Sequence, residues 1–599
     1  MKNSLNETNK SYEVTVVGGG FAGLCAAIAS ARNGAKTALI HNRPVLGGNA
    51  SSEIHVASGG ASHMGERKNV REGGIIDEIF LENRHINSND SPAVLDMLLW
   101  SKAKFQENLD LYLNTAVTDV CTENNKIKSV DAIGITNETK YNFSSDIFID
   151  CTGDGTVAYL SGADYMTGRE GTADFNESGA VSKPDNMTMG NSLLMKWEDT
   201  GHPVKFIRPD WAYDFKDKDL GNLTADDEGY WWIELGGIEL DIIKNYDEIE
   251  TELKRIVAGV WDYIKNSGKF DSDNYDLRWV STVSGKRESR RFIGDYILNE
   301  NDLINGKKFD DAVAYGGWHI DSHEPEKFHH KMRELDGLPD NCEKDKSYHL
   351  NDIYQIPYRC LYSRNIDNLM FAGRNISATH RAIASTRVML TCAIMGQAAG
   401  TAAATAVKNN LNPRKTGQKF IKQIQQQLLK DDCYIPSVKN EDERDYARVS
   451  VIKCSSQTSG NECENVINGV SRIVKDESNC WESNEIKGKE WISLKLHKIT
   501  SVGQIRIYFD SDYSLEIYPT QAKWHRATII TAKTPDTIVK DFSIVLLKEG
   551  KEVLREEIKN NYQRMFVKNL DDISCDEIKI EVSATHGCKA ARIFEIRVY

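Results

Sequence analysis

The sequence predicts an α/β domain built on a parallel sheet, interrupted by an inserted α+β domain and followed by an all-β jelly-roll sandwich. Three observations predict this class. A β-rich run, a glycine-rich turn and an alanine-rich helical run follow one another within residues 13–32. A strand-like run and a long Ala/Gly-rich helical pattern of the same style return at residues 368–408. Residues 446–599 alternate apolar and polar side chains in short runs separated by polar turns.

Each part of the chain has its own local signal. "ENNK" is the polar turn of a β-hairpin predicted within residues 111–137, and residues 144–156 predict a buried strand that enters a glycine turn. A long helix is expected to start near Ser385, and residues 415–430 predict an amphipathic helix. The predicted boundaries are 12–164 and 351–410 for the two parts of the α/β domain, 165–350 for the insert, 411–445 for a helical linker and 446–599 for the sandwich.

Length, charge and cysteine usage restrict the class of protein. A chain of 599 residues is expected to form roughly two to four cores. The net charge of −14, without a polybasic stretch, argues against nucleic acid or an anionic membrane as a partner. We find no apolar run long enough to span a bilayer and no signal peptide in "MKNSLNETNK", so we expect a cytoplasmic protein unless a signal was removed. The 12 cysteines include no CxxC pair, so we expect no metal site.

The glycine turn has the spacing of a dinucleotide-binding motif. Gly18 permits the tight turn, Gly20 lets a pyrophosphate approach the backbone, and Gly23 lets the helix pack on the strand. The free N–H groups at the helix N-terminus then face the phosphates. This motif between a strand and a helix predicts a Rossmann-like domain that binds a dinucleotide.

The choice of dinucleotide depends on the residues after the second strand. The carboxylate that usually binds the adenosine ribose is missing there, and His41, Asn42 and Arg43 take its place. Arg43 is compatible with the 2′-phosphate of NADP. Two segments favour a flavin instead: the small residues of "RPVLGGNASSE" (43–53), and the helix predicted within 371–400, whose N-terminal amides suit an electron-rich ring edge. We therefore expect FAD, with the ribose bound by Asn42 or by a neutral His41.

Five segments carry a resemblance to a known family. They are Gly18/Gly20/Gly23, "RPVLGGNASSE", "IDCTGDGT" (149–156), "GKRESRRFIGDYILNENDL" (285–303) and "NLMFAGRNISATHRAIASTRVMLTCAIMGQAAGTAAA" (368–404). In this order, they resemble the FAD-dependent oxidoreductase family of the glutathione-reductase-like superfamily, distantly similar to fumarate reductase flavoproteins, over roughly residues 12–410. The resemblance implies tightly bound FAD and redox chemistry, and it gives no substrate. The expected cofactor-binding residues are Gly18, Gly20, Phe21, Ala22, Gly23, Asn42, Arg43, Gly47, Gly48, Asn49, Ser51, Val117, Thr152, Gly153, Asp154, Gly373, Arg374 and Arg387.

Catalytic groups are expected from the insert and from the loop that returns to the flavin domain. "YGGWHIDSHEP" (315–325) brings His319, Asp321 and His323 onto one face if it is extended, and histidine is the usual general base near neutral pH. A metal site and a surface polar loop are the alternatives for this group.

"GKRESRRF" contributes Arg287 and Arg290 as candidates to orient an oxygen-rich substrate or a developing oxyanion. The alternative for Arg287, Glu288, Arg290 and Arg291 is an ion-pair network between domains, and we expect at least half of them to serve that. His380 is a further catalytic candidate, because it lies where the chain returns to the flavin domain.

The C-terminal region resembles discoidin-like, coagulation-factor type C modules, which have a galactose-binding-like fold. The resemblance rests on "ENVINGVSR" (464–472), "NCWESNE" (479–485) and the closing "ARIFEIRVY". It implies a module that often binds carbohydrate, with Tyr518 and Trp524 as candidates to stack on a sugar. A structural flank or an oligomerisation surface is the alternative.

We therefore expect an FAD-dependent oxidoreductase that transfers hydride from a carbinol of a sugar, glycoside or sugar acid to flavin N5, with His319 or His323 as base. The alternatives are reduction of a C=C bond, with Arg290 or Arg387 as proton donor or carboxylate clamp, and a carbohydrate-binding protein whose flavin domain is idle. An NADP-dependent dehydrogenase leaves the 43–53 and 371–400 segments unexplained. No second glycine motif for NAD(P)H is evident, which leaves a partner protein, a quinone or dioxygen as electron acceptor. The sequence gives no indication of oligomeric state.

Overall fold

A computed structural model describes residues 5–220, 230–238, 240–323, 343, 345–522, 530–531 and 533–599. The chain divides into two compact units. The first contains Met1–Ala61, Pro92–Ile421 and Tyr518–Thr528, and the second contains Ser62–Ser91, Lys422–Ile517 and Ile529–Tyr599. Two segments thus cross the boundaries expected from the sequence, because 62–91 belongs with the C-terminal region and 518–528 belongs with the N-terminal one.

The first unit is built on a seven-stranded sheet, ordered β3-β2-β1-β6-β5-β4, with β15 beside β6. Its strands are β1 (Asn6–Val17), β2 (Thr37–Ile40), β3 (Leu109–Tyr112), β4 (Thr115–Glu123), β5 (Lys126–Gly134), β6 (Thr139–Asp150) and β15 (Leu369–Phe371). β3, β2, β1, β6 and β15 are mutually parallel, whereas β4 and β5 form the predicted antiparallel hairpin. Asn124 and Asn125 turn this hairpin with φ of 50° and 59°, as type I′ turns require.

The register of the parallel strands brings four loops to one edge. Val17 of β1 pairs with Ile40 and Asp150, and Asp150 pairs with Phe371 of β15. The glycine turn and the residues after 40, 150 and 371 therefore leave the sheet together. Ligands of open parallel sheets bind beyond these carboxyl ends.

Helices α1 (Phe21–Arg32) and α11 (Met389–Lys408) pack together at very short range. A Cβ on Gly396 would lie 2.0 Å from the Ala22 carbonyl oxygen, and one on Gly400 would lie 2.1 Å from that of Ala26. The helix expected from Ser385 is two helices, because Val388 is extended between α10 (His380–Thr386) and α11. The remaining helices of this unit outside the insert are α3 (Pro92–Lys104) and α4 (Thr156–Leu160), while α12 (Pro413–Lys430) runs into the second unit.

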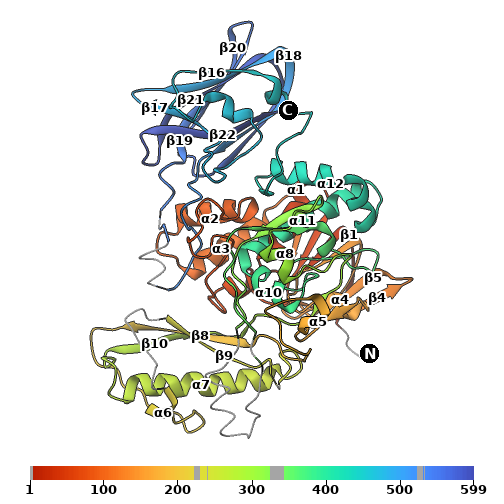
Figure 1. Cartoon of the computed structure of the whole chain (residues 1–599), viewed down its shortest axis with the longest axis vertical. Helices are drawn as coiled ribbons and strands as arrows, with labels where there is room; N and C mark the ends of the chain where they lie inside the picture. Colours follow the sequence, from red (N-terminus) through yellow and green to blue (C-terminus); the bar gives the residue numbers. More distant parts are fainter. Residues whose placement is uncertain are drawn as a thin grey trace. The chain divides into compact units, whose positions relative to one another are not determined.

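The insert has a four-stranded antiparallel sheet covered by one long helix (Figure 1). β8 (Asn191–Asp199) pairs with β9 (Tyr230–Leu235), β10 (Tyr275–Val280) and β11 (Gly285–Lys286). Helix α7 (Tyr246–Asn266) packs Ile256 and Trp261 against Met195 of β8. The smaller elements of the insert are β7 (Tyr165–Met166), α5 (Thr172–Phe175), α6 (Asp217–Leu220), β12 (Arg291–Phe292), α8 (Glu300–Ile304) and β13 (Ala312–Gly316). β13 pairs with β14 (Tyr354–Pro357).

The C-terminal region is an antiparallel β-sandwich, as predicted. Its strands are β16 (Val451–Cys454), β17 (Trp481–Glu485), β18 (Glu490–Phe509), β19 (Val539–Lys548), β20 (Lys551–Ile558), β21 (Met565–Thr585) and β22 (Ala590–Val598). The runs "EWISLKLHKI" and "VGQIRIYFD" are one strand, β18, which pairs along its length with β21 through two register shifts. The first half of β18 also pairs with β16 and the second half with β22.

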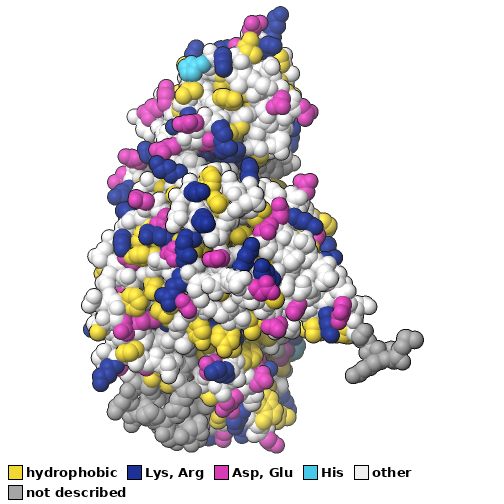
Figure 2. All heavy atoms as spheres, turned by 90° about the vertical axis from the view of Figure 1, so that its right-hand side faces the viewer, with side chains coloured by type: hydrophobic (Ala, Val, Ile, Leu, Met, Phe, Trp, Pro, Cys, Tyr) yellow, Lys and Arg dark blue, Asp and Glu magenta, His cyan; other side chains and the backbone are white. Residues whose placement is uncertain are grey.

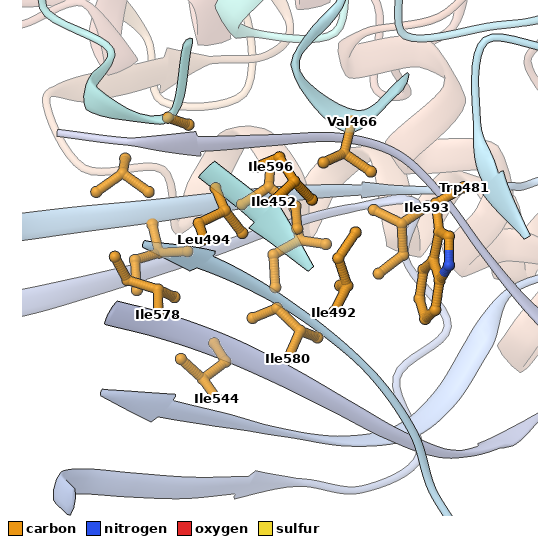
Figure 3. Packing of buried hydrophobic residues seen from close by; sticks show 14 of the residues in the cluster. Ile452, Val466, Trp481, Ile492, Leu494, Ile544, Ile578, Ile580, Ile593 and Ile596 are labelled. Carbon is orange, nitrogen blue, oxygen red and sulfur yellow. The ribbon is translucent and has the colours of Figure 1, made fainter. Parts of the chain in front are cut away.

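Aliphatic side chains from these strands fill the interior of the sandwich, and the fully buried Trp481 lies at one end of the group drawn in Figure 3. The predicted strand "RATIITAK" and the candidate Trp524 lie largely outside the described residues. Tyr518, the other candidate for sugar stacking, is only 2% exposed and belongs to the first unit. It is therefore not an exposed sugar-binding ring of the sandwich.

Segment 62–91, with helix α2 (Ile75–Ile86), is held in the second unit by buried charges. Arg71 pairs with Asp77 at 3.1 Å, and Arg564 pairs with Asp432 at 2.7 Å. The guanidinium carbons of Arg71, Arg472 and Arg564 lie 4.7, 4.2 and 4.6 Å from the centroid of the Tyr513 ring. Cation–π contacts of this kind are strongest when they are removed from water.

Two features concern the expected absence of a nucleic-acid or membrane partner: the charges on the surface and the hydropathy of α11. Lys/Arg and Asp/Glu side chains are interspersed over the face drawn in Figure 2. The expectation about apolar runs needs a correction, because α11 is long and apolar enough to cross a membrane, with a mean hydropathy of 1.3 over its best window. However, 89% of that window is buried, and the helix packs against α1.

Candidate functional site

A cavity of about 630 Å³ lies at the sheet edge where the four loops meet, and its size is typical of a cofactor site. All the expected cofactor-binding residues line it except Gly23 and Ser51. Gly23 instead faces Gly18, because a Cβ there would lie 1.8 Å from the Gly18 oxygen. Ser51 is buried, and its carbonyl accepts the N–H groups of Ile54 and His55, which shapes the loop behind the cavity wall.

The glycine turn has the shape and the polarity that a pyrophosphate requires. Gly18 has φ of 105°, and a Cβ there would lie 2.2 Å from the Cys151 oxygen. A Cβ on Gly20 would find its nearest described atom, Gly48 Cα, at 3.9 Å, so the space beside Gly20 is open. In the described part of the chain no side chain caps α1 at Gly20, and its first turn holds no acid. The partial positive charge at this helix N-terminus fits an anion.

His41, which replaces the expected ribose carboxylate, supports the glycine loop instead. Its Nδ1 accepts the Gly19 N–H at 3.0 Å, and its Nε2 therefore carries the proton and donates to the Val45 carbonyl at 3.0 Å. Burial, followed by the charge of Arg43, lowers the pKa of His41 to about 4, so the ring is neutral. Because both ring nitrogens are engaged, His41 is not available for the ribose, and Asn42 stays the predicted ribose contact.

Asp154 is the centre of an ion-pair group in the cavity wall. It lies 2.6 Å from Arg374 Nη2 and 2.5 Å from Lys286 Nζ, and it accepts a hydrogen bond from Ser289 at 3.0 Å. Burial raises the pKa of this carboxyl, but the charges of Arg374 and Lys286 outweigh it and hold the pKa well below its usual range. Lys286 was not among the expected residues, since a lysine within "GKRESRRF" carries no signal that separates it from its charged neighbours.

The charges of the cavity wall favour an anionic ligand. Among the described residues that line it are four basic side chains and two acidic ones: Arg43, Lys286, Arg374 and Arg387, with Glu53 and Asp154. The excess of positive charge matches the two negative charges of a pyrophosphate group. Together with the open space at Gly20, it shows that the residues present fit FAD.

A second group of charged side chains joins this cavity through Arg387. Arg387 lines the cavity, donates to the Asp321 carbonyl at 3.1 Å, and has its Nη2 3.7 Å from the Asp321 carboxylate. His323 lies between two acids, with Nε2 2.8 Å from Asp321 and Nδ1 3.1 Å from Glu234. Arg287 also pairs with Glu234. We call Glu234, Arg287, Asp321, His323 and Arg387 the insert cluster.

His319 also faces Asp321, with Nε2 3.8 Å from the carboxylate, and its ring stacks on Trp318. Burial raises the pKa of Asp321, but hydrogen bonds from His319 and His323 and the charge of Arg387 hold it well below the usual range. The extended segment thus brings both histidines to one carboxylate, as its spacing predicts. Glu234 is the member of the insert cluster that was not anticipated, because β9 lies about 90 residues away from His323 along the chain.

The other catalytic candidates lie elsewhere. His380 is buried, with Nδ1 2.8 Å from Glu288 and Nε2 2.7 Å from Asp345, and these acids overcome burial and raise its pKa to about 9. Because His380 is buried and its pKa of about 9 keeps the ring protonated near neutral pH, it is a structural cation rather than an available base. The guanidinium carbon of Arg290 lies 3.8 Å from the centroid of the Tyr159 ring, and Arg290 is not among the residues that line the cavity.

Glu288 and Arg291 form the ion-pair network that was the alternative interpretation of "GKRESRRF". Arg291 pairs with Glu170 at 3.0 Å and with Glu288 at 3.3 Å. Only Arg287 of the two arginine candidates therefore reaches the insert cluster.

A comparison with protein families agrees with FAD as the ligand of the cavity. The family model described as FAD dependent oxidoreductase matches residues 13–428. A tRNA uridine 5-carboxymethylaminomethyl modification enzyme, MnmG, of Finegoldia magna is 32% identical over 133 residues, or 20% of this chain. The chain spans about a fifth (21%) of that relative's length.

Among solved structures, a fucose binding module of Streptococcus pneumoniae is 13% identical, with a TM-score of 0.21 over 26% of this chain and 96% of its own. The lectin domain of lectinolysin, complexed with Lewis B antigen, is 18% identical, with a TM-score of 0.20 over 27% of this chain and 98% of its own. The match over 13–428 decides the family: the chain belongs to the FAD-dependent oxidoreductases, and its cofactor is FAD.

Proposed function

We propose that the protein oxidises a carbinol of a sugar, glycoside or sugar acid, using the insert cluster as its substrate site. The observation that carries the proposal is the position of Arg387, which lines the FAD cavity and also contacts Asp321 of the cluster. A substrate held by the cluster would therefore lie beside the cofactor.

The cluster offers the groups that an alcohol oxidation needs. When bound, FAD accepts the hydride of the substrate C–H. The chain itself must bind the hydroxyl and remove its proton. The guanidinium groups of Arg287 and Arg387 suit hydroxyl or carboxylate oxygens. His323 or His319 takes the proton, and the carboxylate of Asp321 stabilises the imidazolium that results.

The substrate class rests on the C-terminal sandwich and its sequence resemblance to discoidin-like modules. A flavoenzyme that carries such a module is suited to a carbohydrate substrate. We propose that the sandwich binds the same glycan material that the flavin site oxidises.

Reduction of a C=C bond is the second candidate, and one observation favours it. Burial and the nearby charge of Arg287 lower the pKa of Arg387 to about 10, against the attraction of Asp321 and Glu234. A guanidinium with a lowered pKa at the cofactor cavity is a better proton donor than an ordinary arginine. Arg290, the other donor considered, does not line the cavity.

Anaerobic mixing of the purified flavoprotein with sugars, glycosides and enoates tests the proposal. Bleaching of the flavin absorbance by a sugar or glycoside supports alcohol oxidation. Reoxidation of the chemically reduced protein by an enoate, without bleaching by any sugar, supports the second candidate. Sugar binding without bleaching supports an idle flavin domain.

Two single variants, His323→Ala and His319→Ala, test the base. One of them is expected to lower the rate of flavin reduction at least a hundredfold, since general base catalysis contributes about 10²–10⁴-fold. His202→Ala, on an exposed loop of the insert, is the matched control. Full rates of flavin reduction in both variants would contradict the assignment.

A further inference from the structure

Lys286 joins the insert to the cofactor loops by both its backbone and its side chain. It belongs to β11, which pairs with β8 of the insert sheet. Its carbonyl accepts the Asn49 side-chain amide at 3.1 Å, and its Nζ lies 2.5 Å from Asp154. Asn49 and Asp154 stand on two different loops of the FAD cavity, so one insert residue contacts both loops.

The surroundings of Lys286 show a built site rather than a surface ion pair. The Lys286 side chain is 16% exposed and that of Asp154 is 19% exposed. The ammonium also lies 5.1 Å from the centroid of the Tyr246 ring, another residue of the cavity lining. A backbone constraint fixes the approach, because a Cβ on the preceding Gly285 would lie 3.0 Å from Ile54.

Asp154 creates an electrostatic problem for an anionic cofactor. Its carboxylate lines a cavity that must receive two phosphate charges. An uncompensated carboxylate there would repel them, and the low local dielectric would strengthen that repulsion. Of the two cations that contact Asp154, only Arg374 would then remain beside it.

We infer that Lys286 is a positioning residue for FAD, supplied by the insert, which neutralises Asp154 and adds to the positive charge of the cavity lining. This role follows from family membership and from the geometry, and it does not depend on the proposed substrate. It also implies that the insert is part of the cofactor site.

The test is FAD affinity, measured by titrating the deflavinated full-length protein with FAD and following flavin fluorescence. Lys286→Met is expected to raise the dissociation constant at least tenfold, and Lys286→Arg is expected to stay within threefold of the parent. The matched control is Lys307→Met, which removes another insert lysine that pairs with an acid, Asp302, at 3.2 Å. It should leave FAD affinity unchanged.

A double variant separates charge neutralisation from packing. In Lys286→Met/Asp154→Asn the carboxylate is gone, so affinity is expected to return to within threefold of that of Asp154→Asn alone. An unchanged dissociation constant in Lys286→Met overturns the inference. So does a double variant that binds no better than Lys286→Met while Asp154→Asn alone binds normally. If Lys286→Met fails to fold, the double variant and Lys286→Arg decide in the same way, by their dissociation constants.

Discussion

Replacing Gly396 with alanine has two effects on the stability of the protein, and they are opposite in sign. Alanine is favoured over glycine in a helix interior by about 1 kcal/mol, so propensity alone predicts a more stable protein. The structure predicts the opposite, because the new Cβ would lie 2.0 Å from the Ala22 oxygen, where ordinary contact begins at 3.4 Å. The two helices must separate by about 1.4 Å locally, and overpacking of this kind costs roughly 1–3 kcal/mol.

The blocking atom is backbone, which cannot rotate away, so we take the upper end of that range. The net loss is then about 2 kcal/mol. Phe21 and Ala22 at the start of α1 line the FAD cavity, so the same displacement is expected to lower FAD affinity. Thermal unfolding with and without added FAD, together with the flavin-to-protein absorbance ratio, measures both effects.

Gly400→Ala is the matched variant. Its Cβ would lie 2.1 Å from the Ala26 oxygen, one helical turn further from the cavity. We expect a similar loss of stability with a smaller loss of FAD. A Gly396→Ala protein that is more stable than the parent and fully loaded with FAD would refute the packing argument.

Three further predictions concern charge and domain organisation. The pKa of His41 is about 4 in the folded protein against 6.5 in the unfolded chain, so the free energy of unfolding is highest above pH 6.5 and falls by about 3 kcal/mol as the pH drops to 4. Urea unfolding across this range should show a weaker pH dependence of that free energy in His41→Gln than in the parent, and equal pH dependence would contradict the prediction. The pKa of His380 is about 9 in the folded protein, so its contribution to the free energy of unfolding is full below pH 6.5 and is lost as the pH rises through 9. The loss of stability in His380→Gln should therefore become smaller above pH 9, and a loss that does not change with pH would contradict the prediction. Ending the chain at residue 445 removes Ala522, which packs on Ile54 and Leu194, so soluble yield and flavin content should fall, whereas an independent appendage would leave both unchanged.

The parts of the structure that the sequence predicted are those whose signal is local. The glycine spacing, the Asn124–Asn125 hairpin and the alternating strands depend on neighbours within a few residues. Apart from "RATIITAK", which lies largely outside the described residues, the structure contains them. The cofactor loops could be predicted as one site because parallel strands end at a common edge.

The remaining features depend on contacts between distant residues. His41 supports the glycine loop by accepting the Gly19 N–H, and His380 is a structural cation because it pairs with Glu288 and Asp345. Glu234 and Lys286 approach the site by way of sheet pairing in the insert, which has weak sequence periodicity. Nothing local in segment 62–91 indicates that it folds with the C-terminal region.

The membership of segment 62–91 in the second unit has a consequence for synthesis of the chain. Arg71 and Arg564, which both contact Tyr513, are separated by 493 residues. At roughly 5–20 residues per second, the ribosome needs about 25–100 s to pass from one to the other. During that time Arg71, Asp77 and α2 are outside the ribosome without the sandwich that later buries them. Folding of this protein therefore cannot be completed from the N-terminus forward, and the last strands to be made complete the burial of one of its first helices.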